Sequence, residues 1–70
     1  MKQPIMVDVE SSNIRSLGHD GESLFVAFKN GGVYAYDCPH VHYANGLGAK
    51  SPGTWLRKEI AGKFPHRKVS

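Results

Sequence analysis

Two tyrosines separated by one residue are the first candidates for chemistry. Tyr34 and Tyr36 lie in the segment 33–38, where alternating side chains predict a β-strand with both phenol rings on one face. If that face is exposed, the rings form a platform for nucleobases, and each stacked base is worth ~1–3 kcal/mol. If a helix covers the face, both tyrosines are core residues with their hydroxyls at the rim. The residue types allow both interpretations.

The sequence around Ser51 predicts the start of a helix and, with it, a phosphate site. Ser51 suits the N-cap position and Pro52 the first helical position. Free backbone N–H groups at a helix start attract anions, and flanking cations would strengthen this attraction. The predicted phosphate-binding residues are Lys50, Ser51, Gly53, Thr54 and Arg57. The competing interpretation is an ordinary capped helix.

Three histidines offer acid–base or metal chemistry. One of His40, His42 and His66 would remove a proton and another would donate one during phosphodiester cleavage. His40 and His42 would point the same way on a strand but diverge by about 200° on a helix. Cys38 and His66 could complete a metal-ligand set, but no second cysteine supports a zinc site. The third interpretation is surface histidines near a helix start. We expect no metal and no other cofactor.

Positive charge is concentrated at the C-terminal end of the chain. The net charge is +3, and it divides into −2 for residues 1–49 and +5 for residues 50–70. Such a basic segment favours a phosphate-bearing or otherwise anionic partner, although a solvated basic surface has the same composition. Arg57 is the first candidate, because its planar group binds phosphate through two hydrogen bonds. The candidate phosphate neutralisers are Arg57, Lys58, Lys63, Arg67 and Lys68.

The elements that position these residues begin with antiparallel strands. The Asp20-Gly21 pair and the run 30–32 are typical of hairpin turns, because Asn, Asp and Gly tolerate their backbone angles. Three strands joined by these turns form a meander, and a short N-terminal strand would present Ile5, Val7 and Val9 on one face. The predicted strands are 14–19, 23–29 and 33–38, with 5–9 as the possible extra strand.

Two C-terminal helices are expected to cover this meander. A short helix over 40–46 would contact the core through Val41 and Leu47, and a second helix would run from 51 to Gly62. Trp55, Leu56 and Ile60 form the apolar stripe of the second helix, which would pack against Phe25 or Phe28. Phe64 and Pro65 in the tail are possible docking residues. The fold class is therefore α+β, with a three-stranded meander packed against one or two helices.

Length and composition exclude several classes of protein. Seventy residues form one small domain, and one cysteine excludes an internally disulfide-bonded scaffold. No apolar run is long enough to span a membrane, and no signal peptide is apparent, so we expect a cytoplasmic setting. A domain of this size is marginally stable, and apolar residues such as Met6 and Val9 make a homodimer plausible.

The order of several short motifs resembles a known family. The motifs are Ser11-Ser12-Asn13-Ile14, the strand 25–29, Gly32-Val33-Tyr34-Ala35-Tyr36, Ser51-x-Gly53 and Ile60-x-Gly62-Lys63-Phe64-Pro65. Together they resemble the KTSC domain family, which is named for a segment at the C-terminus of some lysyl-tRNA synthetases. The resemblance covers residues 9–69 of a single domain, 1–70. It implies a stand-alone bacterial or phage protein, and RNA binding is suggested by the synthetase context. The histidines in the run 39–43 depart from the family pattern.

Three functions are compatible with these observations. The first is a non-catalytic module that binds a phosphate-containing nucleotide or RNA, with Tyr34 and Tyr36 stacking bases. Such a small protein could sequester its ligand, for example a cyclic nucleotide signal in the cytoplasm of a bacterial host. The second is a metal-independent phosphodiesterase that uses the histidines. The third is a protein-interaction domain with an exposed strand edge.

Overall fold

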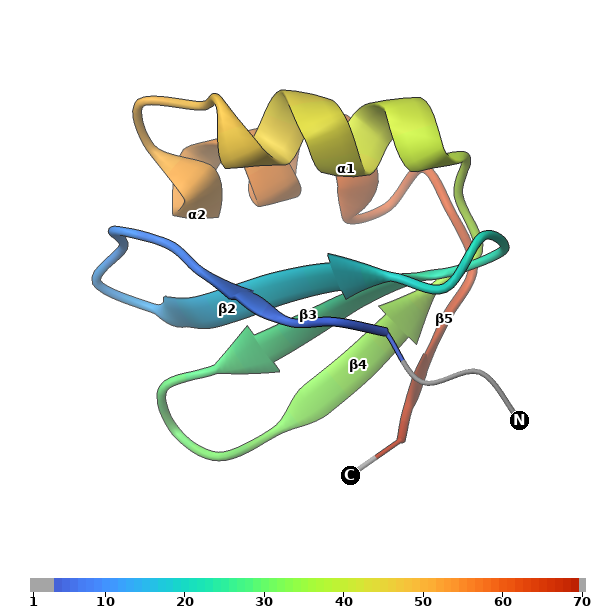
Figure 1. The fold of residues 1–70 in the computed structure, drawn as a ribbon, viewed down its shortest axis with the longest axis horizontal. Helices are drawn as coiled ribbons and strands as arrows, with labels where there is room; N and C mark the ends of the chain where they lie inside the picture. Colours follow the sequence, from blue (N-terminus) through green and yellow to red (C-terminus); the bar gives the residue numbers. More distant parts are fainter. Residues whose placement is uncertain (1–3, 70) are drawn as a thin grey trace.

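A five-stranded antiparallel sheet with helices on one side makes up the computed structural model, which describes residues 4–69 (Figure 1). The strands lie in sequence order and are β1 (Val7–Asp8), β2 (Ile14–His19), β3 (Leu24–Phe28), β4 (Val33–Tyr36) and β5 (His66–Lys68). The helices are α1 (His40–Leu47) and α2 (Pro52–Trp55), and α2 continues directly into the π-helix η1 (Leu56–Ile60). The α+β class and the two helices are confirmed.

Local turn chemistry explains the two hairpins of the meander. Between β2 and β3, the Asp20 carboxylate accepts backbone hydrogen bonds from Glu22 and Ser23, both at 2.8 Å. These bonds, that from Ser23 foremost, hold the pKa of Asp20 below its ordinary value. Between β3 and β4, Gly31 adopts a φ of 103°, and the Asn30 side chain closes the turn. Both predicted hairpins are confirmed.

The C-terminal tail differs from the prediction, because it forms a fifth strand. β5 pairs with β4, and the backbone N–H of Val69 donates to the carbonyl of Val33 at 2.8 Å. Phe64 packs against the core as expected, whereas Pro65 is exposed and does not dock. The predicted three-stranded meander therefore accounts for only part of the five-stranded sheet. β5 escaped prediction because its polar residues carry no alternating pattern.

The N-terminal strand is present but shorter than predicted. β1 covers two residues and pairs with β2, in the register Val7 to Leu17. Ile5 and Val7 are exposed, so two of the three residues of the predicted apolar face are not buried. Val9 packs against the core instead of lying outside it. The chain before β1 passes close to Gly18 of β2, so that a Cβ added to Gly18 would clash with the sulfur of Met6.

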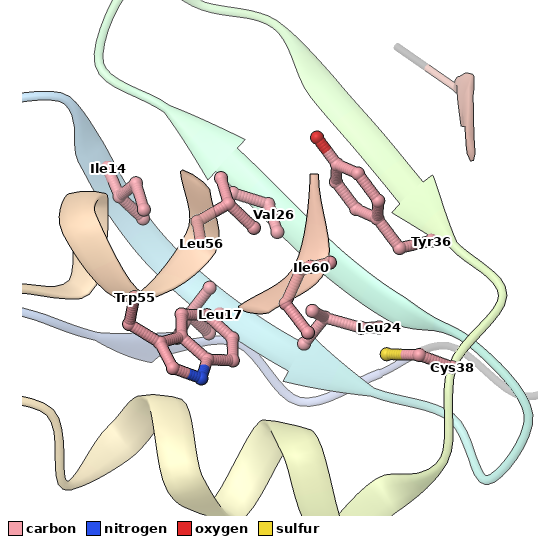
Figure 2. Packing of buried hydrophobic residues seen from close by; sticks show 9 residues of the cluster. All are labelled: Ile14, Leu17, Leu24, Val26, Tyr36, Cys38, Trp55, Leu56 and Ile60. Atoms are coloured by element: carbon pink, nitrogen blue, oxygen red, sulfur yellow. The ribbon is translucent and has the colours of Figure 1, made fainter. Parts of the chain in front are cut away.

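The core lies between the sheet and the helices, as the close-up in Figure 2 shows. Its residues are Ile14, Leu17, Leu24, Val26, Tyr36, Cys38, Trp55, Leu56 and Ile60. Phe28 packs against this cluster, so of the two phenylalanines it is the one that joins the core. Phe25 alternates with Leu24 and Val26 and projects from the opposite face of the sheet. The predicted stripe of Trp55, Leu56 and Ile60 is confirmed.

Helix α1 turns a different side to the core from the one predicted. Val41 is 58% exposed and Leu47 is 39% exposed, so neither makes the expected apolar contact. Gly46 is buried instead, and the indole of Trp55 lies against it. A helix with a glycine on its inner side lets a large ring approach closely. Tyr43 of the same helix also packs against the core, and His42 contacts Phe64.

The second helix begins as predicted and ends in an unusual turn. Ser51 is the N-cap and Pro52 the first helical residue. The N–H of Ala61 donates to the carbonyl of Leu56 at 2.7 Å, the spacing of a π-helix. This turn buries Leu56 and Ile60 and leaves the intervening charged residues exposed. Within the described residues, no helix is long and apolar enough to cross a membrane.

Candidate functional site

Four rings adjoin one another on the helix side of the sheet, towards its β5 edge. We call them the ring shelf: Phe28 of β3, Tyr34 and Tyr36 of β4, and His66 of β5. The Tyr36 and His66 rings stack, with centroids 5.3 Å apart. The Tyr34 ring lies 5.6 Å from the Phe28 ring and 6.0 Å from the His66 ring. The rings share one face because Tyr36 pairs directly with His66, as Tyr34 does with Lys68.

A hollow of about 580 Å³ lies beside the shelf, and we call it the shelf hollow. Its lining residues are Phe28, Asn30, Gly31, Gly32, Tyr34, Tyr36 and Lys68. Lys68 is the single charged side chain in this lining, and it is positive. The Asn30 side-chain oxygen accepts from the N–H of Gly32 at 3.2 Å, so its amide NH₂ group remains available to a ligand. Ring faces, an amide and a cation therefore meet at one place.

The two tyrosines of the shelf have different surroundings. Tyr36 is 6% exposed and belongs to the core, and burial raises the pKa of its phenol. Figure 2 shows its hydroxyl directed away from Cys38 and Leu24, at the border of the cluster. Tyr34 is half-buried and packs against the outside of the core. Of the two predicted stacking residues, Tyr34 thus presents the accessible ring, and Tyr36 lies in the core with its hydroxyl at the rim.

The residues of the predicted phosphate site do not gather around one point. α2 is only four residues long, and the Ser51 hydroxyl donates to the Thr54 hydroxyl at 3.0 Å. Lys50 lines a hollow that also contains Asp8 and Glu10. Gly53 and Arg57 line a different hollow, beside Asn13 and Phe28. None of these residues lines the shelf hollow, so the predicted convergence with both tyrosines does not occur.

Two further predicted cations also lie away from the shelf hollow. Arg67 pairs with Ala35, so strand alternation places it on the face opposite to Tyr34. It borders a hollow that contains Glu22 and Asp37. Lys58 is exposed on η1 and lines none of the hollows named here. The basic segment of the sequence is therefore spread over several faces of the molecule.

The three histidines predicted for acid–base chemistry have separate ring neighbours. The His40 ring lies 5.1 Å from His19, and the His42 ring lies 5.1 Å from Phe64. His66 belongs to the ring shelf. No pair of the three is in ring contact with each other among the described residues. In the same part of the chain, no group of three His, Cys, Asp or Glu side chains is placed to hold a metal ion.

His19, the last residue of β2, was not among the predicted site residues, and it connects three parts of the chain. Its Nε2 lies 2.8 Å from the carbonyl oxygen of Cys38, and its Nδ1 accepts the N–H of Gly21 at 3.0 Å. Because Nδ1 accepts, Nε2 carries the proton and donates to Cys38. The Cys38 side chain is buried, and desolvation raises the pKa of its thiol. These residues therefore serve the packing of the hairpin and of the entry to α1.

Sequence reasoning missed the partners that complete the shelf. The sequence offers Phe28 only as an alternative to Phe25 in the core, and Asn30 only as a turn residue. The alternation of Leu24, Val26 and Phe28 does place them on one face, which was the available signal. Nothing in the sequence revealed β5, and its pairing with β4 is what brings His66 and Lys68 beside Tyr34.

Comparisons with known proteins agree with the fold. A model of a protein family, the KTSC domain, matches residues 10–64. The crystal structure of a KTSC domain protein from Yersinia pestis is similar to the chain, with a TM-score of 0.88 and 32% sequence identity. That similarity covers 97% of this chain and 100% of the other. The comparison with curated proteins found no match. The matched region 10–64 contains Phe28, Tyr34 and Tyr36, whereas His66 lies beyond it.

Proposed function

The chain belongs to the KTSC domain family, and from this premise we propose that it is a non-catalytic binding module for a phosphate-containing nucleotide or RNA. The observation that carries the proposal is the composition of the shelf hollow. It combines the accessible Tyr34 ring, the Asn30 amide and the Lys68 ammonium within one lining. A nucleotide presents the matching groups, namely an aromatic base and a phosphate.

Each group of the shelf hollow has a distinct part in this proposal. Tyr34 stacks on the base, because every nucleobase offers a π-face, and this contact is worth ~1–3 kcal/mol. Lys68 neutralises a phosphate charge at the edge of the sheet. Asn30 donates from its amide to a base edge or a phosphate oxygen. Gly31 and Gly32 carry no side chains, so the ligand can approach the backbone between β3 and β4.

Binding without turnover is favoured over phosphodiester cleavage. Cleavage by an acid–base pair needs two imidazoles within reach of one phosphate. His66 lies on the shelf, but His40 and His42 contact other rings. Mass spectrometry of the ligand after long incubation separates the two functions. We expect the ligand to be unchanged, whereas a cleavage product that disappears in His66→Ala would establish an enzyme.

Sequestration of a nucleotide signal is the biological role that we attach to this module. A non-catalytic chain of 70 residues removes free ligand only by binding it, in proportion to its own concentration. The resemblance to the KTSC family implies that stand-alone members also occur in phages. The setting that we propose is the cytoplasm of a bacterial host, where the free thiol of Cys38 stays reduced. Binding of a cyclic mononucleotide or dinucleotide would identify this ligand class.

A homodimer is also part of the proposal, and it rests on exposed apolar residues. Ile5 is 83% exposed, and Met6 and Val7 beside it are partly exposed as well. A second subunit would remove these side chains from water. Light scattering over a range of protein concentrations measures the mass directly. A monomer at every concentration would remove the dimer without affecting the shelf hollow.

Calorimetric titration at low salt tests the binding function. The ligands are a mononucleotide, a cyclic mononucleotide, a cyclic dinucleotide and a short RNA. We expect Tyr34→Ala to weaken binding roughly tenfold, as the loss of one base stack predicts, and Tyr34→Phe to retain it. Lys68→Ala removes the cation of the shelf hollow. Its matched control is Arg15→Ala, because Arg15 is exposed on β2 and is absent from the lining of the shelf hollow. Binding of none of these ligands would overturn the proposal. Salt-insensitive binding of a protein would favour an interaction domain.

A further inference from the structure

Two more hollows adjoin the shelf hollow and share its walls. The first has a volume of about 530 Å³ and shares Phe28 and Asn30 with the shelf hollow. The second has a volume of about 140 Å³ and shares Phe28 with both, and Asn13 with the first. Phe28 therefore stands at the junction of three hollows. We call the three hollows together the Phe28 track.

The charges along the Phe28 track are all positive. Each of its three hollows contains one cation: Lys68 in the shelf hollow, Lys29 in the next and Arg57 in the smallest. No carboxylate lines any of the three. The hollows that lie off the track differ in this respect. One contains Asp8 and Glu10, and the other contains Glu22 and Asp37. The carboxylates that line hollows therefore lie away from the Phe28 track, and the order of residues does not show this separation.

Polar and aromatic groups alternate with these cations. Asn13 and Asn30 border the track between successive cations, and both carry side-chain amides. Phe28 and Tyr34 have rings in edge contact, with centroids 5.6 Å apart. A single nucleotide has one base and would fill the shelf hollow alone. It would leave Lys29 and Arg57 without a phosphate.

We infer that, among the nucleotide and RNA ligands of the proposed function on which this inference rests, the preferred one is a linear single-stranded oligonucleotide and not a cyclic nucleotide, and that it runs along the Phe28 track from Lys68 to Arg57. Successive phosphates lie against Lys68, Lys29 and Arg57, while bases stack on the Tyr34 and Phe28 rings. Single-strand binding proteins combine a positive groove with aromatic platforms in the same way. A mononucleotide or a small cyclic nucleotide contacts only the first of the three cations.

The dependence of affinity on salt counts the phosphates that are bound. For single strands, the logarithm of the binding constant falls with the logarithm of salt concentration by about 0.7 per neutralised phosphate. Three cations therefore predict a slope of about −2, and a ligand confined to the shelf hollow predicts about −0.7. Removal of any track cation should reduce the slope by about 0.7.

Fluorescence anisotropy with labelled oligouridylates of about two, four and eight nucleotides provides the test, since single-strand sites extend over several nucleotides. We expect affinity to rise at least tenfold from the shortest to the longest strand. Arg57→Ala and Lys29→Ala should each weaken binding of the longest strand, and Arg57→Lys should retain part of it. The matched control is Arg15→Ala, which changes the net charge equally at a residue outside the track.

Phe28 is tested by a substitution that preserves packing. Phe28→Leu keeps an apolar side chain against the core but removes the π-face, so strand binding should weaken while the unfolding midpoint changes little. Equal affinity for a mononucleotide and the longest strand, with Arg57→Ala behaving as Arg15→Ala, would overturn the track and leave the proposed function intact. Absence of binding to every ligand would overturn both.

Discussion

On its helix side, the sheet has a covered half, β2 and β3, against which α1 packs, and an open half, β4 and β5. The two halves differ in how deeply their side chains are buried. One row of paired residues crosses both halves: Leu17 of β2, Val26 of β3, Tyr34 of β4 and Lys68 of β5. Leu17 and Val26 are fully buried, Tyr34 is half-buried and Lys68 is exposed. Helix α1 packs against β2 and β3, so the row emerges from the helical layer as it reaches β4. On this face, a residue belongs to the core where a helix covers it and to the candidate site where no helix does. Strand alternation alone does not separate the two groups.

The two halves of the sheet differ in the kinds of side chain that they hold. The covered half holds the buried apolar side chains, and their removal from water is the main source of stability. The open half leaves the Tyr34 ring and the Lys68 side chain at least partly in contact with solvent, where the proposed ligand would bind. Substitutions should separate the two halves by their effects on unfolding and on binding.

The largest effect is expected from the buried end of the row. Leu17→Ala should lower the free energy of unfolding by about 2–5 kcal/mol, because it leaves a cavity among residues that cannot collapse fully. Lys68→Ala at the exposed end should change it by less than about 0.5 kcal/mol. Urea denaturation measures both, and Leu17→Met gives a milder variant if the alanine variant does not fold. A comparable loss in Lys68→Ala would contradict the division.

A smaller effect is expected where the helices meet. A methyl group at Gly46 would lie within 2.7 Å of three carbons of the Trp55 indole, so Gly46→Ala should destabilise the fold by about 1–3 kcal/mol. Gly48→Ala is the matched control, because the nearest atom to its new methyl group is the Asn45 carbonyl oxygen at 3.9 Å. Thermal unfolding followed by tryptophan fluorescence reports both. Equal midpoints would show that α1 shifts freely over the sheet.

The smallest effect is expected from the residue at the border of the halves. Burial raises the pKa of Tyr36, and the unfolded chain therefore loses this proton at lower pH than the folded chain. Stability attributable to Tyr36 is present below about pH 10 and declines as pH rises towards the folded pKa. Tyr36→Phe should flatten this decline in unfolding experiments at alkaline pH. An unchanged pH profile would mean that the phenol is not desolvated.

Cys38 contributes to the same alkaline decline and needs its own control. Desolvation raises the pKa of its thiol, so its contribution to stability is also lost as pH rises through the alkaline range. Cys38→Ala in the Tyr36→Phe background separates the two residues. A remaining decline in that double variant would have to come from other groups.

Local signals predicted the elements whose structure depends on neighbouring residues. The Asp20 and Asn30 turns formed because their side chains bond to backbone groups two or three residues away. Ser51 and Pro52 also mark a helix start locally, because the extended backbone of Ser51 and the fixed φ of Pro52 suit the N-cap and first helical positions. The inner side of α1 was predicted wrongly, because Val41 and Leu47 look apolar in sequence while only the position of Trp55 selects Gly46.

The candidate site was predicted in part, for a related physical reason. The two-residue period of a strand is sufficient to place Tyr34 and Tyr36 on one face. It contains no information about which helix lies above that face, so it did not distinguish the half-buried Tyr34 from the buried Tyr36. The cations of the track come from the turn after β3, from β5 and from η1, which are far apart in the chain.

The order of residues alone determined the hairpins, the two helix starts, the KTSC family and the strand face that carries the tyrosines. These features depend on backbone angles and side-chain bonds within a few residues. Tertiary structure alone decided that the tail becomes β5, and that Lys68, Lys29 and Arg57 each line a hollow that Phe28 also lines. Those outcomes depend on backbone pairing and packing between distant segments, whose energies no local pattern of residues records.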